Sequence, residues 1–346
     1  MSGTTVTPDQ MSASRRAQGV GVALLRVGGV FITVLIIALI FGALSGGKFF
    51  ITANLLNVLR YASTVAIIGL GLLLVIVVGE IDLSFGFLYG LCANFMAVAW
   101  LMWGWPAPVA LIGAFLVAIF WGLFNAFFTT VIKIPSFIAT LGSGTLIFGF
   151  TLLITDTKTF NYLYPDSGIK PNPGDVDFFR GLANQALPEK FPMQGVWLIV
   201  VAAVFWFILS RSLFGFRLKA IGGNPEAARL ARLPVRKYKF AAFVICAVMA
   251  CLAAMLNFSF IGSTQPSAGQ ELLFPTFAAV IIGGASLTGG RGSVAGVIAG
   301  ALLLAVLANG LALLSAGPFA QQVLLGTVVI GAVVLDRLTS GAAKLR

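Results

Sequence analysis

Ten stretches of mostly apolar residues, each 15 to 25 residues long, alternate with short polar segments along the chain. They cover 27–45, 61–78, 83–102, 107–131, 136–154, 194–211, 240–261, 274–288, 293–314 and 319–335. A helix of about 20 apolar residues crosses the hydrocarbon core of a bilayer. The pattern therefore predicts an all-α, polytopic membrane protein with about ten transmembrane helices. Continuous apolar runs, rather than alternating segments of about ten residues, exclude a membrane β-barrel.

The composition agrees with a chain that is mostly surrounded by lipid. Of its 346 residues, 59% are hydrophobic and only 10% are charged, whereas soluble domains carry about a quarter charged residues. We expect one transmembrane domain over 27–337, with tails at 1–26 and 338–346. The first run is longer than the apolar part of a signal peptide, which has about 7–15 residues. We interpret it as an uncleaved span, although Ala43-Leu44-Ser45 resembles a cleavage site.

The basic residues predict the orientation. Ten spans put both termini on one side, and with that side inside, 16 of the 22 Lys and Arg residues lie in inner segments. This asymmetry follows the positive-inside rule, so the termini are expected in the cytoplasm. The net charge of +11 then reports topology rather than nucleic-acid binding, and no nucleic-acid partner is expected.

Several kinds of site are excluded by missing residue types. The chain has no His, and its three Cys, at 92, 246 and 251, lie separately inside apolar runs. Zinc and haem sites are therefore not expected, and neither is any other cofactor. No G-x-x-x-x-G-K-[ST] phosphate loop occurs, so the chain is not expected to bind ATP by itself.

The inner segment 212–239 is the most basic part of the chain. Eight Lys and Arg lie between 211 and 239, and burying them in lipid would cost on the order of 20 kcal/mol. Asn224 is a good N-cap, Pro225 suits a first helical turn, and Pro234 disfavours helix at Leu233. These signals predict a short helix of about nine residues. One stripe of it holds Ala227, Leu230 and Ala231, and another holds Arg229, Arg232 and Arg236.

Two interpretations of this segment remain open. It is either a solvated loop that also attracts anionic membrane lipid, or a docking element for a partner protein. The compact, capped and alanine-rich pattern favours docking, because attraction to lipid requires only charge. The outer loop 155–193 is similarly open, as a folded cap, a docking surface or a plain connector.

Three further stretches carry candidate chemistry. GEIDLSFG (79–86) holds the only acids between Asp9 and Asp156, and acids at a break in the membrane are functional candidates. Glu80 and Asp82 could form a proton or cation relay, or Asp82 or Ser84 could simply cap the next helix. In PSFIATLG (135–142), Ser136, Phe137 and Thr140 line a pathway only if they face a cavity. Gly142, Gly144, Gly296 and Gly300 are expected to allow close helix packing.

A faint internal repeat relates 121–143 to 305–327. The ungapped alignment pairs Leu123 with Leu307, Asn125 with Asn309, Leu141 with Leu325 and Gly142 with Gly326. The first copy spans an inner turn and the second an outer turn, so the copies would be inverted, as in many transporters. Chance similarity is the alternative.

Four ordered motifs resemble the permease subunits of ABC importers, in the branch that carries ribose, xylose and galactose. They are GEIDLSFG, PSFIATLG, AIGGNPEAARLARLPV and VIIGGASLTGGRGS. The resemblance implies a permease that pairs with a second copy, binds two ATPase subunits and receives solute from an extracytoplasmic binding protein. It also implies a location in the inner membrane. The coupling helix of the family matches Asn224, Glu226, Ala227, Ala228, Arg229 and Leu230, and Arg232 is expected to help seat it.

The resemblance implies a non-enzymatic translocation subunit for a monosaccharide or related polyol. The same architecture also resembles permeases for branched-chain amino acids and nucleosides. A secondary transporter that uses Glu80 and Asp82 is the remaining alternative.

Overall fold

The computed structural model describes residues 28–165, 169–183, 192–317 and 319–334, apart from 325, 329, 332 and 333 in the last segment. Both predicted tails lie outside the described residues. Each of the ten apolar runs contains a helix. The prediction of an all-α, polytopic membrane protein is confirmed.

Six of these helices are long and apolar enough to span a membrane, and four are shorter. The six are α2 (Thr52–Val77), α4 (Ala107–Thr130), α5 (Ser136–Thr155), α7 (Met193–Arg211), α10 (Val235–Ile261) and α12 (Val294–Leu313). The shorter ones are Gly28–Leu44, α3 (Phe85–Leu101), α11 (Leu273–Ile282) and Phe319–Val328. Outside them lie α6 (Pro173–Gly181), α8 (Leu213–Gly223), α9 (Pro225–Leu230), and the 3-10 turns η1 (Lys48–Phe50) and η2 (Gln270–Leu272).

Three helix boundaries differ from the predicted runs. Helix α2 begins nine residues before the second run and includes Arg60, whose guanidinium lies over the Phe260 ring at 4.4 Å from its centroid. This cation–π contact lets the helix continue through a charge. Helix α10 begins at Val235, and α11 ends at Ile282 because the following Gly284 has a positive φ of 88°.

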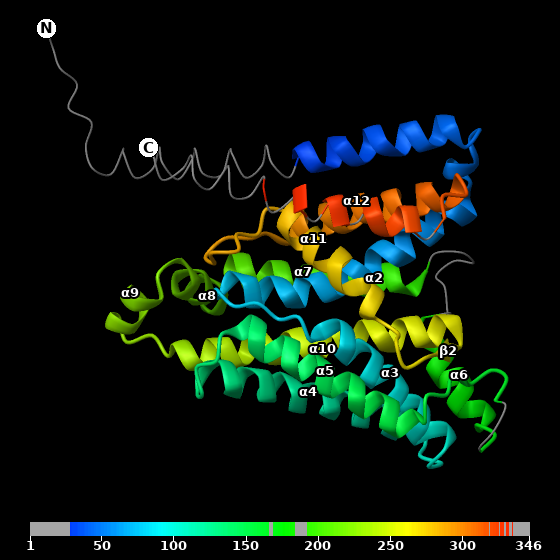
Figure 1. The fold of residues 1–346 in the computed structure, drawn as a ribbon, viewed down its shortest axis with the longest axis horizontal. Coiled ribbons are helices and arrows are strands. Elements are labelled where there is room, and N and C mark those ends of the chain that lie inside the picture. Colours follow the sequence, from blue (N-terminus) through cyan, green and yellow to red (C-terminus); the bar gives the residue numbers. More distant parts are fainter. Residues whose placement is uncertain are drawn as a thin grey trace, which may run out of the picture.

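Helix α2 forms the centre of the bundle. Helices α7, α10, α11 and α12 pack around it, and its residues from Val65 to Val77 are fully buried. Helices α4 and α5 lie at one side (Figure 1), and they expose large apolar side chains such as Leu116, Phe120 and Leu153. Because those side chains face outward on helices of membrane length, this side is a lipid-facing surface.

The bundle has two different ends (Figure 1). Helices α8 and α9 extend from one end, which we call the basic end, and α6 lies at the other, the cap end. At the cap end, strand β1 (Phe160–Asn161) pairs antiparallel with β2 (Ser263–Thr264). The described part of the loop 155–193 is therefore folded, which agrees with the predicted alternative of a folded cap.

Glycines let α11 and α12 approach each other closely, as predicted for Gly296 and Gly300. A Cβ added at Gly296 would lie 1.8 Å from the Gly283 carbonyl oxygen, and one at Gly300 would lie 2.1 Å from the Ala279 oxygen. In α5 the prediction holds for Gly144, which faces Phe87. It is wrong for Gly142, whose added Cβ would meet nothing within 4 Å.

The contrast between these glycines gives a matched pair of variants. We expect Gly296→Ala to lower the free energy of unfolding by about 3 kcal/mol, because the methyl group forces two backbones apart. Gly142→Ala should be neutral or stabilising by up to about 1 kcal/mol, because Ala favours helix. Thermal unfolding in detergent measures both. Equal midpoints for the two variants would contradict the packing described here.

Candidate functional site

The chain leaves helical geometry between α2 and α3, in the first motif. Gly79 has a positive φ of 86°, and the residues from Glu80 to Ser84 form no helix or strand. The amide of Ile81 donates to the Ser136 Oγ at 3.0 Å, and that of Leu83 donates to the Thr140 Oγ1 at 3.0 Å. Two hydroxyls of α5 thus bind the backbone that the break exposes. The first two motifs form one unit.

A buried polar network lies beside this break. The Asp82 carboxylate accepts from the Ser84 amide at 2.8 Å and from its hydroxyl at 2.7 Å. The Asn125 amide donates to the Ser84 Oγ at 2.7 Å. Neither the Asp82 nor the Ser84 side chain accepts a hydrogen bond from an amide inside α3. The prediction that one of them caps this helix is therefore wrong. Asp82 instead stabilises the turn that precedes the helix, because its short side chain reaches the backbone two residues on.

Glu80 forms an ion pair with Lys239 of α10. The two side chains are 12% and 18% exposed, respectively. The opposite charges of these two part-buried side chains attract each other. The pair also fastens the break to the start of α10, 159 positions along the chain.

The basic segment folds as two short helices, α8 and α9. The Asn224 side chain accepts from the amides of Glu226 and Ala227 at 3.1 and 3.0 Å, as predicted for an N-cap. Lys219 of α8 donates to the Leu209 carbonyl at 2.9 Å. Burial lowers the pKa of the Lys219 ammonium. This hydrogen bond anchors the base of the segment to α7.

Helix α9 has six residues, so the predicted length of about nine residues is wrong. It ends in a Schellman motif, in which the Leu233 amide donates to the Ala228 carbonyl and the Arg232 amide to the Arg229 carbonyl. Arg232 takes the left-handed position at φ 57°, where glycine is usual. This turn ends the helix before Pro234 can affect it. Arg236, predicted on the same basic stripe, belongs to α10.

The surface of α9 is divided. Ala228 is buried against the bundle. Ala227, Arg229, Ala231 and Arg232 are exposed, and Leu230 is 86% exposed. A leucine that protrudes this far beside arginines forms a compact apolar knob with a basic border. Such a surface suits a protein groove more than it suits water.

Backbone contacts connect the basic segment to α2 and to the fourth motif. Gly222 lies so close to α2 that a Cβ there would be 1.8 Å from the Val77 carbonyl oxygen and 2.7 Å from the Gly290 nitrogen. The Gly290 amide donates to the same Val77 oxygen at 2.9 Å. Gly290 has a positive φ of 77°. We call the contact among Val77, Gly222 and Gly290 the glycine junction.

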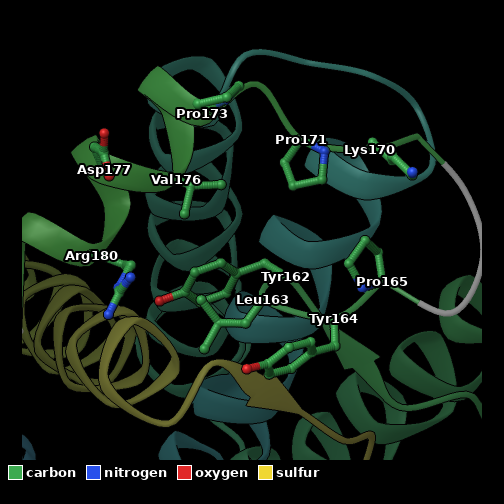
Figure 2. A pocket seen from close by; sticks show the side chains of 10 residues that line it. All are labelled: Tyr162, Leu163, Tyr164, Pro165, Lys170, Pro171, Pro173, Val176, Asp177 and Arg180. Atoms are coloured by element: carbon green, nitrogen blue, oxygen red, sulfur yellow. The ribbon is translucent and has the colours of Figure 1, made fainter.

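The cap end carries an open cavity of about 760 Å³. Figure 2 shows its labelled side chains, with Asp177 and Arg180 on one side, Lys170 on the other and two tyrosines below. Tyr162 donates to the Ser259 carbonyl at 2.6 Å. Burial raises the pKa of Tyr162 to about 12, although Arg180 counteracts this. The cap is a fixed, polar and aromatic surface.

The family of the chain follows from comparison with known sequences. The profile of the family described as "Branched-chain amino acid transport system / permease component" matches residues 54–335. The chain belongs to this family. No solved structure gives a significant match to the permease. Because the family consists of transport components, the expectation of a non-enzymatic subunit agrees with it.

Named relatives match the permease over most of its length. The xylose transport system permease protein of Haemophilus influenzae is 30% identical over 369 residues, which cover 93% of this chain and 98% of that protein. The ribose import permease protein of Bacillus subtilis is 33% identical, and the D-allose transport system permease protein of Escherichia coli is 32% identical. In both cases the match covers 90% of this chain and 92% of the relative.

Eight residues of the permease are candidates for the translocation pathway or for a structural motif, and the structure brings six of them together and leaves two apart. Those that meet around the break are Glu80, Asp82, Ser84, Asn125, Ser136 and Thr140. Phe137 is half-exposed on the outer surface of α5. Asn309 lies elsewhere, in mutual hydrogen bonds with Asn54 at 2.8 and 2.9 Å. A transport role for any of these side chains remains a prediction.

The two asparagines paired by the predicted repeat occupy different environments. Asn125 binds a hydroxyl near the basic end, and Asn309 binds a second asparagine near the start of α2. Both join their helix to α2 or to the segment that follows it. Leu325 of the second copy lies outside the described residues. The inverted repeat stays a prediction.

Three contributors were missed at the sequence level. Lys239 was counted among solvated basic residues, yet it lies in the first turns of α10 and neutralises Glu80. The pairing of Asn54 spans 255 positions, and no local pattern marks it. Thr129 was hidden in an apolar run, although its buried hydroxyl has no partner among the described residues.

Thr140 and Thr145 of α5 test the support of the break. Thr140→Val leaves the Leu83 amide without its hydroxyl partner, which should cost about 1–3 kcal/mol of unfolding free energy. The Thr145 hydroxyl is exposed and donates only to the Leu141 carbonyl of its own helix, so Thr145→Val is the control and should be nearly neutral. Thermal unfolding in detergent compares the two. A control as destabilised as Thr140→Val would refute the support role.

Proposed function

We propose that the permease is the translocation subunit of an ATP-driven ABC importer for a monosaccharide or related polyol. The observation that carries the proposal is α9, a short capped helix with an exposed Leu230 and exposed arginines at the basic end. Relatives named for xylose, ribose and allose support the solute class. The energy comes from separate ATPase subunits, in agreement with the missing phosphate loop.

The basic end faces the cytoplasm of the cell and the cap end faces outward across the inner membrane. The positive-inside distribution of charge supports this orientation, with both termini in the cytoplasm. Residues 27–337 act as one permease domain. It works as a pair, either of identical copies or of two related chains, as permeases of this architecture do.

The coupling segment passes force to the bundle through the glycine junction. When an ATPase cleft closes on Leu230, α9 moves with it, and α8 follows because Asn224 joins the two helices. Gly222 contacts Val77 and Gly290 without an intervening side chain. The displacement therefore reaches α2 and the loop between α11 and α12 at one point.

The cap end is the docking surface for the extracytoplasmic binding protein. The described part of 155–193 is held in place by β1, α6 and buried aromatic side chains, among them Tyr162, Phe179 and Phe258. Lys170, Asp177 and Arg180 give it charges of both signs. A rigid surface of this kind can bind another protein at little conformational cost.

Two other classes of solute, branched-chain amino acids and nucleosides, can be distinguished from sugars by an uptake experiment. Uptake of branched-chain amino acids or nucleosides fits the same architecture, and the family description names the former. Reconstitution with the co-purified ATPase and binding protein, followed by uptake of labelled xylose, ribose, leucine and adenosine, distinguishes the solutes. Uptake of leucine or adenosine without sugar uptake would overturn the sugar proposal.

Leu230 and Arg232 test the docking role of α9. We expect Leu230→Ala and Arg232→Gly together to lower ATP-driven uptake at least about ten-fold, because an exposed apolar anchor contributes 1–2 kcal/mol or more to an interface. Glycine suits the positive φ of Arg232, so the variant should fold.

Arg211→Gly is the matched control, since Arg211 lies at the same end but packs over Trp206. It should leave uptake unchanged. Membrane levels of all variants are compared by immunoblot. Full uptake by the Leu230/Arg232 variant would remove α9 from the coupling mechanism.

Glu80 and Lys239 distinguish an ABC permease from a secondary transporter. Glu80→Gln should cost about 3 kcal/mol of unfolding free energy, because it leaves a buried ammonium unpaired. The exchanged pair, Glu80→Lys with Lys239→Glu, should recover most of this stability and restore uptake. A carboxylate relay instead predicts that uptake needs the acid at position 80 and collapses with a proton uncoupler.

A further inference from the structure

Two neighbouring cavities lie at the basic end, between α4, α5, α9 and α10. The first, of about 340 Å³, is lined by one acid, Glu80, and by basic and hydroxyl side chains, including Thr129, Lys133, Arg229, Arg236 and Lys239. The second, of about 440 Å³, is lined by Val131, Arg236, Lys237 and Phe240. Arg236 borders both. A polar, basic compartment thus adjoins a more apolar one.

The first cavity carries an excess of positive charge. Lys239 is neutralised by Glu80, but no described residue forms an ion pair with Lys133, Arg229 or Arg236. Three cations gathered around one hollow repel one another, and this repulsion is relieved when an anion enters. The chemistry of the cavity therefore selects a negatively charged group.

Thr129 gives an independent indication of a ligand. Its side chain lines the first cavity and is 8% exposed, and its Oγ1 has no hydrogen-bond partner among the described residues. A buried hydroxyl without a partner costs free energy, and native structures rarely retain one without a reason. An anionic oxygen in the cavity would be a hydrogen-bond acceptor for this hydroxyl.

The second cavity indicates what carries the anion. Val131 and Phe240 offer apolar surface next to Arg236. Phe127, one helical turn before Val131, and Ile132, which follows it, are exposed apolar side chains. A free phosphate would use only the first cavity. A phospholipid would use both, with its phosphate among the basic residues and an acyl chain along the apolar side chains.

We propose that these cavities form a binding site for an anionic phospholipid, wedged between the membrane domain and the coupling helix α9. Lys133 and Arg236 bind the phosphate, the Thr129 hydroxyl donates to it, and Val131 and Phe240 contact the acyl chain. Arg229 reaches the same phosphate from α9. The lipid therefore supports the position of the coupling helix. This site goes beyond the transported solute and does not depend on its identity.

Native mass spectrometry of the full-length protein in non-ionic detergent tests the site. The probes are phosphatidylglycerol and phosphatidylcholine of equal chain length. We expect preferential retention of phosphatidylglycerol. Lys133→Gly and Arg236→Gln should each weaken its binding about five-fold, because one basic side chain near a membrane surface contributes about 1 kcal/mol. Glycine fits the positive φ of 67° at Lys133, so this variant keeps its backbone.

Three controls make the result decisive. Arg211→Gln removes the same charge at the same end, outside both cavities, and should change binding less than about two-fold. Arg236→Lys keeps the charge and should retain binding. Thr129→Val should raise the unfolding temperature while it weakens binding, because it removes an unpaired buried hydroxyl of the same shape. If Thr129 only supported the fold, its replacement would not raise the unfolding temperature and weaken lipid binding at the same time.

Several outcomes would overturn the proposal. Equal retention of the two lipids would show that the site does not distinguish an anionic headgroup from a zwitterionic one. Equal losses in Arg211→Gln and Arg236→Gln would show attraction to the whole basic end rather than to a site. Binding of inorganic phosphate that Lys133→Gly and Arg236→Gln abolish, with no retention of phosphatidylglycerol, would assign the first cavity to a free anion and not to a lipid.

Discussion

Backbone amides that leave a helix inside a membrane must find partners within the protein, because the hydrocarbon offers none. The rest of this structure depends on how that requirement is met. Between α2 and α3 the partners are the hydroxyls of Ser136 and Thr140 on α5. After α10, the carbonyl of Gln265 accepts from the buried Asn94 of α3 at 2.9 Å. These two irregular segments are thus held by polar side chains from helices that are distant in sequence.

The same requirement explains why the four motifs occur in one chain. GEIDLSFG supplies the break, PSFIATLG supplies the hydroxyls that satisfy it, and the glycine pairs of the other two motifs meet at the end of α2. None of these segments is complete alone. The break without α5 would leave amides unpaired, and the glycine turns without each other would leave a gap at the Val77 carbonyl.

Much of the fold could be predicted from sequence, because lipid imposes a simple rule on every span. The apolar runs predicted the positions of the membrane helices, and Asn224 and Pro225 predicted the start of α9. Its end was mispredicted because the left-handed turn at Arg232 uses a residue type that carries no turn signal. The pairs Glu80–Lys239 and Asn54–Asn309 were out of reach, since they depend on how distant helices pack. For the same reason, the sequence could not distinguish Gly142 from Gly144: both were expected to allow close packing, and only Gly144 makes a close contact.

The glycine junction also sets the mechanical stiffness of the molecule. A connection made of long side chains would yield by changing rotamers, and a small push at α9 would be lost within it. Here the Gly290 amide bonds directly to the Val77 carbonyl, with Gly222 against both, so the joint has almost no slack. If α9 is displaced as proposed, the displacement would therefore be passed on as a tilt or rotation of whole helices. Any deformation would then occur by sliding along the helix surfaces rather than at the glycine junction.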